Sequence, residues 1–366
     1  MRLLKAGLTV AIVAVFVSHA GYSQKGMRKA TSSSTGSVVA TGNMTAIRFD
    51  HAAALLPSGQ VLIVGGIERN GVMQSSAELF DPAIGHFTPT GKLQSAHGWG
   101  VTATLLPDGK VLVAGGSTGC DSPCYTASAE IYDASTRRFI LTGSMTVPRA
   151  GARALLLPNG DVLIVSGVES ERASGELYHP ATGRFSVAGA MHLPDPIQLV
   201  LLKNGKVLVV GASRAELYDP TTNRFSITGS MTVPRTKFGA ALLPDGRVLI
   251  AGGQIGGSWG ERVSSTEIYD PETGRFSQGP ELKLKRFKLA KAVVPLKNGR
   301  ILVGGGADQA EIYEPSLGVF LPVTGTKLDG FCFSTATVLN DGEVLLAGGY
   351  ASPGGAGVNH AWIYQP

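Results

Sequence analysis

Short apolar segments separated by tight turns recur along the whole chain, at intervals of roughly 40 to 50 residues. Each unit begins with an apolar stretch that ends in Leu-Leu-Pro-x-Gly or a close variant, as in residues 51–59. A continuous apolar run follows after a short turn, which predicts a hairpin whose second strand is buried on both faces. This run occupies residues 61–66, 111–116, 162–167, 207–212, 248–253, 301–306 and 344–349.

A third segment, Ala-Glu-Leu-Phe-Asp-Pro at residues 77–82, also returns in every unit. Its later copies are residues 129–133, 175–180, 215–220, 266–271, 310–315 and 361–366. A fourth, short and aromatic segment follows at 86–91 and recurs around five further phenylalanines, Phe139, Phe185, Phe225, Phe276 and Phe320. Each unit therefore predicts four short strands.

The one missing fourth strand is supplied by the beginning of the chain. Residues 38–45 align with residues 225–232, and the last unit has no fourth segment of its own after its third. A strand at 37–44 would complete the last unit and close a ring, which leaves no open sheet edge between the first and last units. We predict an all-β fold over residues 37–366, a β-propeller of seven four-stranded blades around a central channel.

The composition supports many short strands, and the N-terminal segment predicts where the protein is located. The 366 residues include 49 glycines and 20 prolines. Arg2 and Lys5, the apolar run 6–17 and a small-x-small cleavage site at 18–20 predict a secretory signal peptide over 1–20, with an uncleaved anchor as the alternative. Residues 21–36 are predicted to be a flexible linker. Removal of the signal lowers the net charge from +5 to +3 (30 basic minus 27 acidic residues), which gives no argument for nucleic-acid binding. We expect a secreted or periplasmic protein.

The three cysteines fit an exported protein. Cys120 and Cys124 lie four residues apart in a loop and are expected to close a small disulfide. No further metal ligands lie nearby in the sequence, so we expect no metal site there. Cys332 lies in an apolar segment and is expected to be a buried small hydrophobe.

The paired glycines after the second strand, the Tyr-Asp-Pro after the third, the aromatic in the fourth and a Met-x-x-Pro-Arg linker resemble kelch repeats. The resemblance covers about 330 residues and is specific because the motifs recur in register. The fourth-strand aromatic is Phe, where kelch blades usually have Trp, and this exchanges one packing ring for another. Kelch propellers include binding domains and a few enzymes, so the resemblance leaves function open.

Two enzyme types come with this resemblance. Galactose-oxidase-like propellers hold copper with two Tyr and two His, one Tyr being crosslinked to a Cys. The histidines of this chain after the signal show no ligand spacing and are His51, His86, His97, His179, His192 and His360. Sialate mutarotases have six repeats rather than seven, which disfavours a sugar-isomerising enzyme. The glutamate that recurs in six units is interpreted as scaffold, since a catalytic carboxylate is normally unique.

The linker that leads into each first strand gives the candidate ligand residues. Its last position is Arg48, Arg149, Arg235 and Arg286 in four units and His97, Asp195 and Asp329 in the others. The resemblance places this position near the channel mouth, and animal kelch adaptors grip acidic peptides with arginines in this linker. Arginine binds carboxylates and phosphates in a bidentate manner. The alternative is that each arginine pairs with a repeated glutamate inside the scaffold.

Long loops on the same face carry three aromatic candidates for ligand stacking, Tyr125, Trp259 and Tyr350. These rings could equally fold onto their own loops. The densest charge cluster contains Lys283, Lys285, Arg286, Lys288 and Lys291. The even spacing of Lys283, Lys285 and Lys291 suggests one solvated face.

We therefore predict an exported, non-catalytic, monomeric binding propeller without a cofactor. Its ligand would be a carbohydrate or an acidic protein segment at the channel mouth, bound by Arg48, His97, Arg149, Arg235, Arg286, Tyr125, Trp259 and Tyr350. Two alternatives stay open. One is a carbohydrate-active oxidase or epimerase at the same mouth, and the other is a structural module of a cell-surface assembly.

Overall fold

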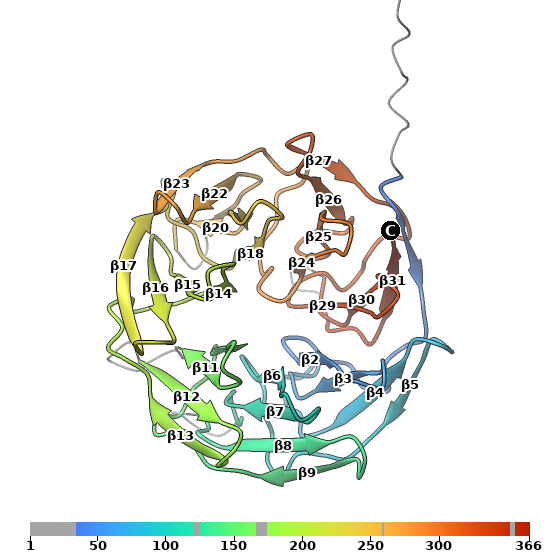
Figure 1. Ribbon diagram of the computed structural model, residues 1–366. Coiled ribbons are helices and arrows are strands. Elements are labelled where there is room, and N and C mark those ends of the chain that lie inside the picture. The colour runs from blue at the N-terminus through green and yellow to red at the C-terminus, as the bar shows by residue number, and fades with distance from the viewer. Residues whose placement is uncertain (1–33, 120–123, 166–173, 258–259, 352–355) are drawn as a thin grey trace, which may run out of the picture. The chain divides into compact units, whose positions relative to one another are not determined.

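A computed structural model describes residues 34–119, 124–165, 174–257, 260–351 and 356–366. Residues Thr35–Pro366 form one compact unit. Within the described residues all regular elements are strands, and they build seven blades of antiparallel strands (Figure 1). The predicted all-β, seven-bladed propeller is confirmed.

Each blade runs outward from the channel in sequence order, except for the last one. Blade 1 contains β2 (Ala52–Leu55), β3 (Val61–Val64), β4 (Ala77–Asp81) and β5 (His86–Pro89). Blade 2 contains β6 (Thr102–Leu105), β7 (Val111–Ala114), β8 (Ala129–Asp133) and β9 (Arg138–Leu141). Blade 3 contains β10 (Arg153–Leu156), β11 (Val162–Val165), β12 (Gly175–His179) and β13 (Arg184–Val187). Blade 4 contains β14 (Gln198–Leu201), β15 (Val207–Val210), β16 (Arg214–Asp219) and β17 (Arg224–Ser230).

The remaining blades follow the same plan. Blade 5 contains β18 (Gly239–Leu242), β19 (Val248–Ala251), β22 (Thr266–Asp270) and β23 (Arg275–Gln278), with a small hairpin of β20 (Gln254–Ile255) and β21 (Glu261–Arg262) in its loop. Blade 6 contains β24 (Val293–Pro295), β25 (Ile301–Val303), β26 (Glu311–Glu314) and β27 (Val319–Pro322). Blade 7 contains β29 (Thr335–Val338), β30 (Val344–Ala347), β31 (Ala361–Gln365) and β1 (Ser37–Ala40), and β28 (Thr324–Gly325) adds to its edge.

The innermost strands surround the channel. They contact one another in the order β2, β6, β10, β14, β18, β24 and β29, and β29 contacts β2 again (Figure 1). The second strand of every blade is buried on both faces, as its continuous apolar run predicts. Neighbouring blades pack through these residues, because the side chains of a second strand point alternately toward the blade before and the blade after it.

The aromatic residue of the third strand packs on the phenylalanine of the fourth strand in blades 1 to 6. The ring centroids lie 4.7 Å apart in the pair Phe80–Phe87 and 5.0 Å apart in Tyr313–Phe320, with tilted planes. Such contacts add to the burial of the two rings. Phenylalanine is therefore a sufficient partner at the position where kelch blades usually have Trp.

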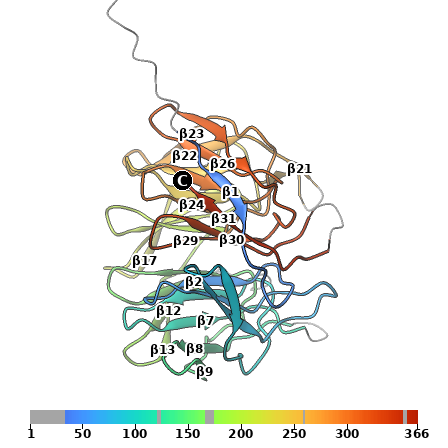
Figure 2. The ribbon, with the colours of Figure 1, turned by 90° about the vertical axis from the view of Figure 1, so that its right-hand side faces the viewer.

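The N-terminal strand closes the ring. β1 pairs antiparallel with β31, in the register Ser37 to Gln365 through Ala40 to Trp362, so that the two ends of the propeller chain share one sheet (Figure 2). The predicted ring closure is confirmed, although the closing strand ends at Ala40 instead of continuing to residue 44. The predicted signal peptide lies outside the described residues and stays a prediction. Within the described ranges no helix is long and apolar enough to span a membrane.

Candidate ligand site at the channel mouth

One face of the propeller carries both the linkers into the first strands and the loops between second and third strands. Isolated bridges tie the two kinds of segment together, as between Phe49 and Ile67 or between Thr236 and Gln254. The residues at the start of each innermost strand therefore lie at the mouth of the channel on this face.

The four linker arginines are buried and paired with the repeated glutamates of the third strands. The Nη2–Oε1 distances are 2.9 Å for Arg48–Glu78, 3.0 Å for Arg149–Glu176, 3.2 Å for Arg235–Glu267 and 2.9 Å for Arg286–Glu311. No side chain in these pairs is more than 1% exposed. We call these four pairs the rim pairs.

Each rim pair is built into the backbone around it. Arg48 donates from Nη1 to the carbonyl of Gly65 at 2.8 Å, and Glu78 accepts from the backbone N–H of Thr45 at 2.6 Å. Burial lowers the pKa of all four guanidinium groups, and the partner carboxylate opposes this shift. This arrangement matches the scaffold interpretation. A ligand role for these arginines stays a prediction, and it would require the pairs to open.

Three blades depart from the arginine pattern, and in one of them, blade 7, Asp329 lies 2.7 Å from His360. His97 replaces the arginine in blade 2 and lies 3.6 Å from Glu130, with both side chains fully buried. In blade 4 Asp195 takes the position, and Glu216 instead binds the exposed His192 at 3.0 Å. Its second oxygen, Oε2, is buried without a hydrogen-bond partner in the described residues.

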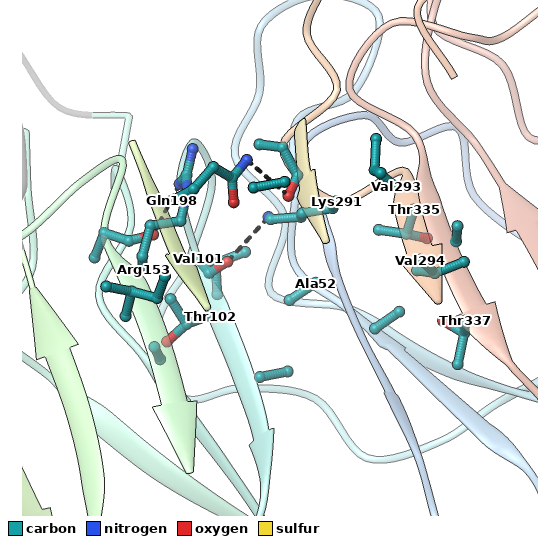
Figure 3. Close-up of a pocket in the computed structure, with 18 residues that line it drawn as sticks. Ala52, Val101, Thr102, Arg153, Gln198, Lys291, Val293, Val294, Thr335 and Thr337 are labelled. Atoms are coloured by element: carbon teal, nitrogen blue, oxygen red, sulfur yellow. Dashed lines mark hydrogen bonds between the residues drawn. The ribbon is translucent and has the colours of Figure 1, made fainter. Parts of the chain in front are cut away.

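A cavity of about 320 Å³ lies inside the channel mouth. Its wall consists mainly of small residues from the innermost strands, which keeps the channel wide. Three residues bring hydrogen-bonding groups of long side chains into it, Arg153, Gln198 and Lys291 (Figure 3). The wall also includes the threonines Thr102, Thr335 and Thr337. A cavity of this size accommodates a group as large as one monosaccharide.

Arg153 is the first residue of β10 and projects into the cavity (Figure 3). Its guanidinium donates to carbonyl oxygens only, from Nε to Ile197 at 2.7 Å and from Nη1 to Gly151 and Ala152 at 3.1 and 2.9 Å. Within the described residues no carboxylate forms an ion pair with Arg153 and no acceptor binds its Nη2. Burial lowers the pKa of this arginine, and the charge of Asp50 opposes the shift.

Lys291 reaches across the channel from the linker of blade 6 (Figure 3). Its Nζ donates to the carbonyls of His51 and Val101 at 2.8 and 3.1 Å and lies 3.4 Å from Asp50 Oδ1. Gln198 makes a similar connection from blade 4, donating from Nε2 to the carbonyl of Phe238 at 2.9 Å. Lys291 thus connects blade 6 to blades 1 and 2, and Gln198 connects blade 4 to blade 5.

Two buried polar groups beside the cavity have spare hydrogen-bonding capacity in the described structure. Asp50 is 6% exposed, and its Oδ2 has no partner. His51 Nε2 lies 2.9 Å from Thr335 Oγ1, while Nδ1 is buried without a partner. Burial lowers the pKa of His51 well below its usual 6.5, and the charges of Arg48 and Lys291 lower it further. The net charge of Asp50, Arg153 and Lys291 is positive.

One of the repeats also matches a known repeat family in its amino-acid sequence. Residues 235–283, which span blade 5 and the linkers at its two ends, match the family model described as the Kelch motif. The other blades repeat the plan of this segment in the same register. The chain is a seven-bladed β-propeller of kelch-type repeats.

A solved structure resembles this kelch propeller over most of its length. It is described as a novel fungal alcohol oxidase with catalytic diversity among the AA5 family, in complex with copper. The two chains share 18% identity with a TM-score of 0.74, and the match covers 91% of this chain and 76% of the oxidase. At this identity the likeness shows the fold alone. No curated protein matches the sequence.

The residues at the mouth of this kelch propeller do not fit a copper centre. Among the lining residues of the cavity there is no His, Tyr or Cys. In the described ranges no three residues of the types His, Cys, Asp and Glu are grouped so as to hold a metal ion. We therefore derive no copper chemistry for this chain.

The aromatic candidates have different positions. Tyr350 is half-buried on the mouth face, where its ring lies 5.1 Å from the ring of Phe49. Tyr125 is half-buried in the loop of blade 2 and bridges Ser117. Trp259 and Cys120 lie outside the described residues, so the stacking role of Trp259 and the Cys120–Cys124 disulfide stay predictions. Cys332 is fully buried as expected, and burial raises the pKa of its thiol to about 11.

Arg153 and Lys291 are the cavity residues that the sequence prediction missed. In the strand register Arg153 corresponds to Ala52, Thr102, Gln198, Gly239, Ala292 and Thr335 in the other blades. A single charge among small or neutral residues at a repeated position was the available signal. Lys291 was assigned to a solvated face, whereas it crosses the channel.

Proposed function

We propose that this protein is an exported, non-catalytic binding propeller that holds an acidic carbohydrate at its channel mouth, with the ligand's carboxylate on Arg153. The observation that carries this proposal is the guanidinium of Arg153, which enters a cavity of about 320 Å³ without a carboxylate partner in the described residues. Nη2 of Arg153 has no acceptor in the described residues, and its two N–H groups can bind a ligand carboxylate through charge-assisted hydrogen bonds.

The cavity favours a sugar acid over an acidic protein segment. The linker arginines that the peptide interpretation relied on are engaged with their own glutamates. Arg153, which forms no ion pair with a carboxylate of the described residues, lies at a concave cavity whose wall carries hydroxyl and amide groups, which suit the hydroxyl groups of a sugar. An extended peptide would instead need accessible cations along the rim.

The test is a titration of the protein with D-galacturonate and with neutral D-galactose by isothermal calorimetry. We expect galacturonate to bind and galactose to bind more weakly or not at all. Arg153→Met should weaken galacturonate binding by roughly 10- to 150-fold, the equivalent of a charged hydrogen bond of about 1.5–3 kcal/mol. Arg184→Met is the matched control, because Arg184 is exposed on the outer strand of the same blade.

Equal binding of the two sugars, or equal binding to the parent and Arg153→Met, would contradict the proposal. Turnover of galacturonate by the parent protein, detected by product analysis, would replace the binding role with an enzymatic one.

A further inference from the structure

Four residues at the channel mouth have a backbone conformation that residues with side chains rarely adopt. They are Asp50, Lys237, Lys288 and Phe333, with φ between 52° and 59°. Asp50, Lys237 and Lys288 lie two residues after the last linker position of blades 1, 5 and 6. Phe333 lies four residues after Asp329 in blade 7, directly after the bridge residue Cys332, as Asp50 follows the bridge residue Phe49. We call them the collar. The two other non-glycine residues with positive φ in the described part of the chain, Arg137 and Asn223, lie in turns before a fourth strand.

The backbone of the collar is continuous. The N–H of Asp50 donates to the carbonyl of Phe333 at 2.9 Å, the N–H of Phe333 donates to Lys288 at 3.3 Å, and Leu289 donates to Lys237 at 3.2 Å. Nothing in these backbone bonds requires a side chain at the collar positions.

Glycine meets the same backbone demand on the opposite side of the mouth. Gly100 and Gly151 have φ values of 72° and 70° in the linkers of blades 2 and 3, and a Cβ on Gly100 would lie 1.8 Å from the nitrogen of Gly151. The fold therefore uses glycine where nothing else fits and carries charged or aromatic residues on one side only. Unfavourable backbone conformations that persist at one place indicate that the side chains there have a function.

Two of the collar side chains are lysines without an ion-pair partner in the described residues. Lys237 Nζ binds the amide oxygen of Gln254 at 3.1 Å, and Lys288 Nζ binds the hydroxyl of Tyr350. Lys288 also lies 4.7–5.0 Å from the ring centroids of Phe287, Phe333 and Tyr350, which hold its ammonium in place.

The two lysines are neighbours in the collar, since Leu289, the residue after Lys288, donates its backbone N–H to the carbonyl of Lys237 at 3.2 Å. Burial lowers the pKa of Lys288, and the charges of Lys237 and Arg262 lower it further, against the opposing effects of Cys332 and Asp50. Burial also lowers the pKa of Lys237. An anion between the two lysines would relieve the repulsion between their charges.

We infer that Lys237 and Lys288 form a second anion subsite, which holds an acidic group on the sugar next to the one in the channel. The collar adjoins the channel site, since Asp50 contacts Lys291 and Lys291 follows Lys288 by three residues. This inference rests on the proposed function and specifies it. The ligand is an oligosaccharide with acidic groups on neighbouring units.

The experiment compares D-galacturonate with trigalacturonate by calorimetry, using the parent and four variants, Lys237→Gly, Lys237→Arg, Lys288→Met and Arg137→Gly. The parent should bind trigalacturonate at least about tenfold more tightly than galacturonate, since one added charge contact of about 1.4 kcal/mol corresponds to tenfold. Lys237→Gly should lose most of this gain without lowering Tm, because glycine relieves the backbone conformation. Lys237→Arg keeps the charge and should keep the gain. Arg137→Gly relieves the same conformation away from the mouth and should leave both affinities unchanged.

The outcomes separate the two proposals. If trigalacturonate binds Lys237→Gly and Lys288→Met as tightly as the parent, the collar subsite is overturned, while galacturonate binding through Arg153 is unaffected. If galacturonate fails to bind but trigalacturonate binds through Lys237, the channel proposal is overturned and the collar stands. A tri-glutamate peptide that binds better than trigalacturonate and depends on Lys237 would overturn the assignment to a sugar.

Discussion

Arg149 and Arg153 lie four residues apart at the entrance to blade 3, yet they belong to two different kinds of site. Arg149 is 1% exposed and binds Glu176 at 3.0 Å, as its counterparts do in three other blades. Arg153 donates only to carbonyls and projects into the channel cavity. In the rim pairs an arginine is neutralised by a glutamate of the scaffold, whereas in the channel site an arginine faces a cavity without a carboxylate partner in the described residues.

The difference lies in repetition. A charge that recurs in several blades meets a partner that also recurs, and the two neutralise each other inside the scaffold. A charge that occurs in one blade has no recurring partner, so its electrostatic field remains available to a ligand. Unique residues at repeated positions are therefore better candidates for function in a propeller than the repeated residues themselves.

The largest expected effect is on stability, from breaking a rim pair. Arg235→Met should lower the free energy of unfolding by about 3–5 kcal/mol, because it leaves Glu267 as an unpaired buried charge. Arg153→Met should cost about 1.5 kcal/mol, the lower end of the range for a charged hydrogen bond, since it leaves no buried carboxylate unpaired. Urea denaturation of both variants measures the two costs. Equal costs would remove the distinction between the rim and the channel.

Lys291 should combine both roles and give an intermediate effect. Lys291→Met removes donors from the carbonyls of His51 and Val101 and leaves Asp50 without its nearest cation. We expect a loss of about 2 kcal/mol in unfolding free energy, the usual size for a charged hydrogen bond, together with weaker galacturonate binding. A variant that loses binding but keeps full stability would show that Lys291 belongs to the channel site alone.

His51 should make stability depend on pH. Its folded-state pKa lies well below 6.5, so under pH 6.5 the unfolded chain takes up a proton that the folded protein does not. Stability should therefore fall as the pH drops, with a contribution of up to about 1.4 kcal/mol per pH unit until the folded pKa is reached.

This contribution is measured as the difference between the parent and His51→Gln in denaturation curves from pH 7.5 to 5. The variant should lose less stability over this range than the parent. His86→Gln, at an exposed position on β5, should behave as the parent does. Parallel curves for the parent and His51→Gln would contradict the assignment.

The smallest effect is expected in blade 4, where the arginine is missing. Glu216→Gln should change the unfolding free energy by less than about 1 kcal/mol, because one of its two carboxylate oxygens has no partner to lose. Glu267→Gln in blade 5 should cost more, since Arg235 would lose its counter-charge. The difference between the two losses in unfolding free energy, measured by urea denaturation, gives the contribution of a rim pair beyond that of a buried glutamate without an arginine.

The fold could be predicted from the sequence because each blade repeats the same four strand signals. Seven copies of one pattern fix the strand order, and the unmatched segment at the N-terminus identifies the closing strand. For the rim arginines, two interpretations were open from the sequence, contact with a ligand and burial against a repeated glutamate. Sequence shows that an arginine and a glutamate recur together, but which way a guanidinium points depends on packing.

The channel site was less accessible to prediction. Lys283 and Lys285 are exposed as their even spacing suggested, but the same argument is wrong for Lys291. Residues 283–291 form a linker that ends before β24 begins at Val293, so the alternation of a strand does not apply to them. Arg153 required the register of β10 against β11, which places its side chain on the channel side of the blade.

The pairing of β1 with β31 also has a consequence for the order of folding. Blades 1 to 6 consist of strands that are neighbours in sequence, so each can form from local hairpins as soon as its own residues are available. Blade 7 joins Ser37–Ala40 to Ala361–Gln365, and this contact must overcome the loop-closure entropy of nearly the whole chain. Once blades 1 to 6 have formed, less flexible chain separates β1 from β31, and the entropy cost of pairing them is smaller. Ring closure is therefore expected to be the last step. Until then, the edges of blades 1 and 7 face an incomplete ring, and the nascent propeller is most open to aggregation at that stage.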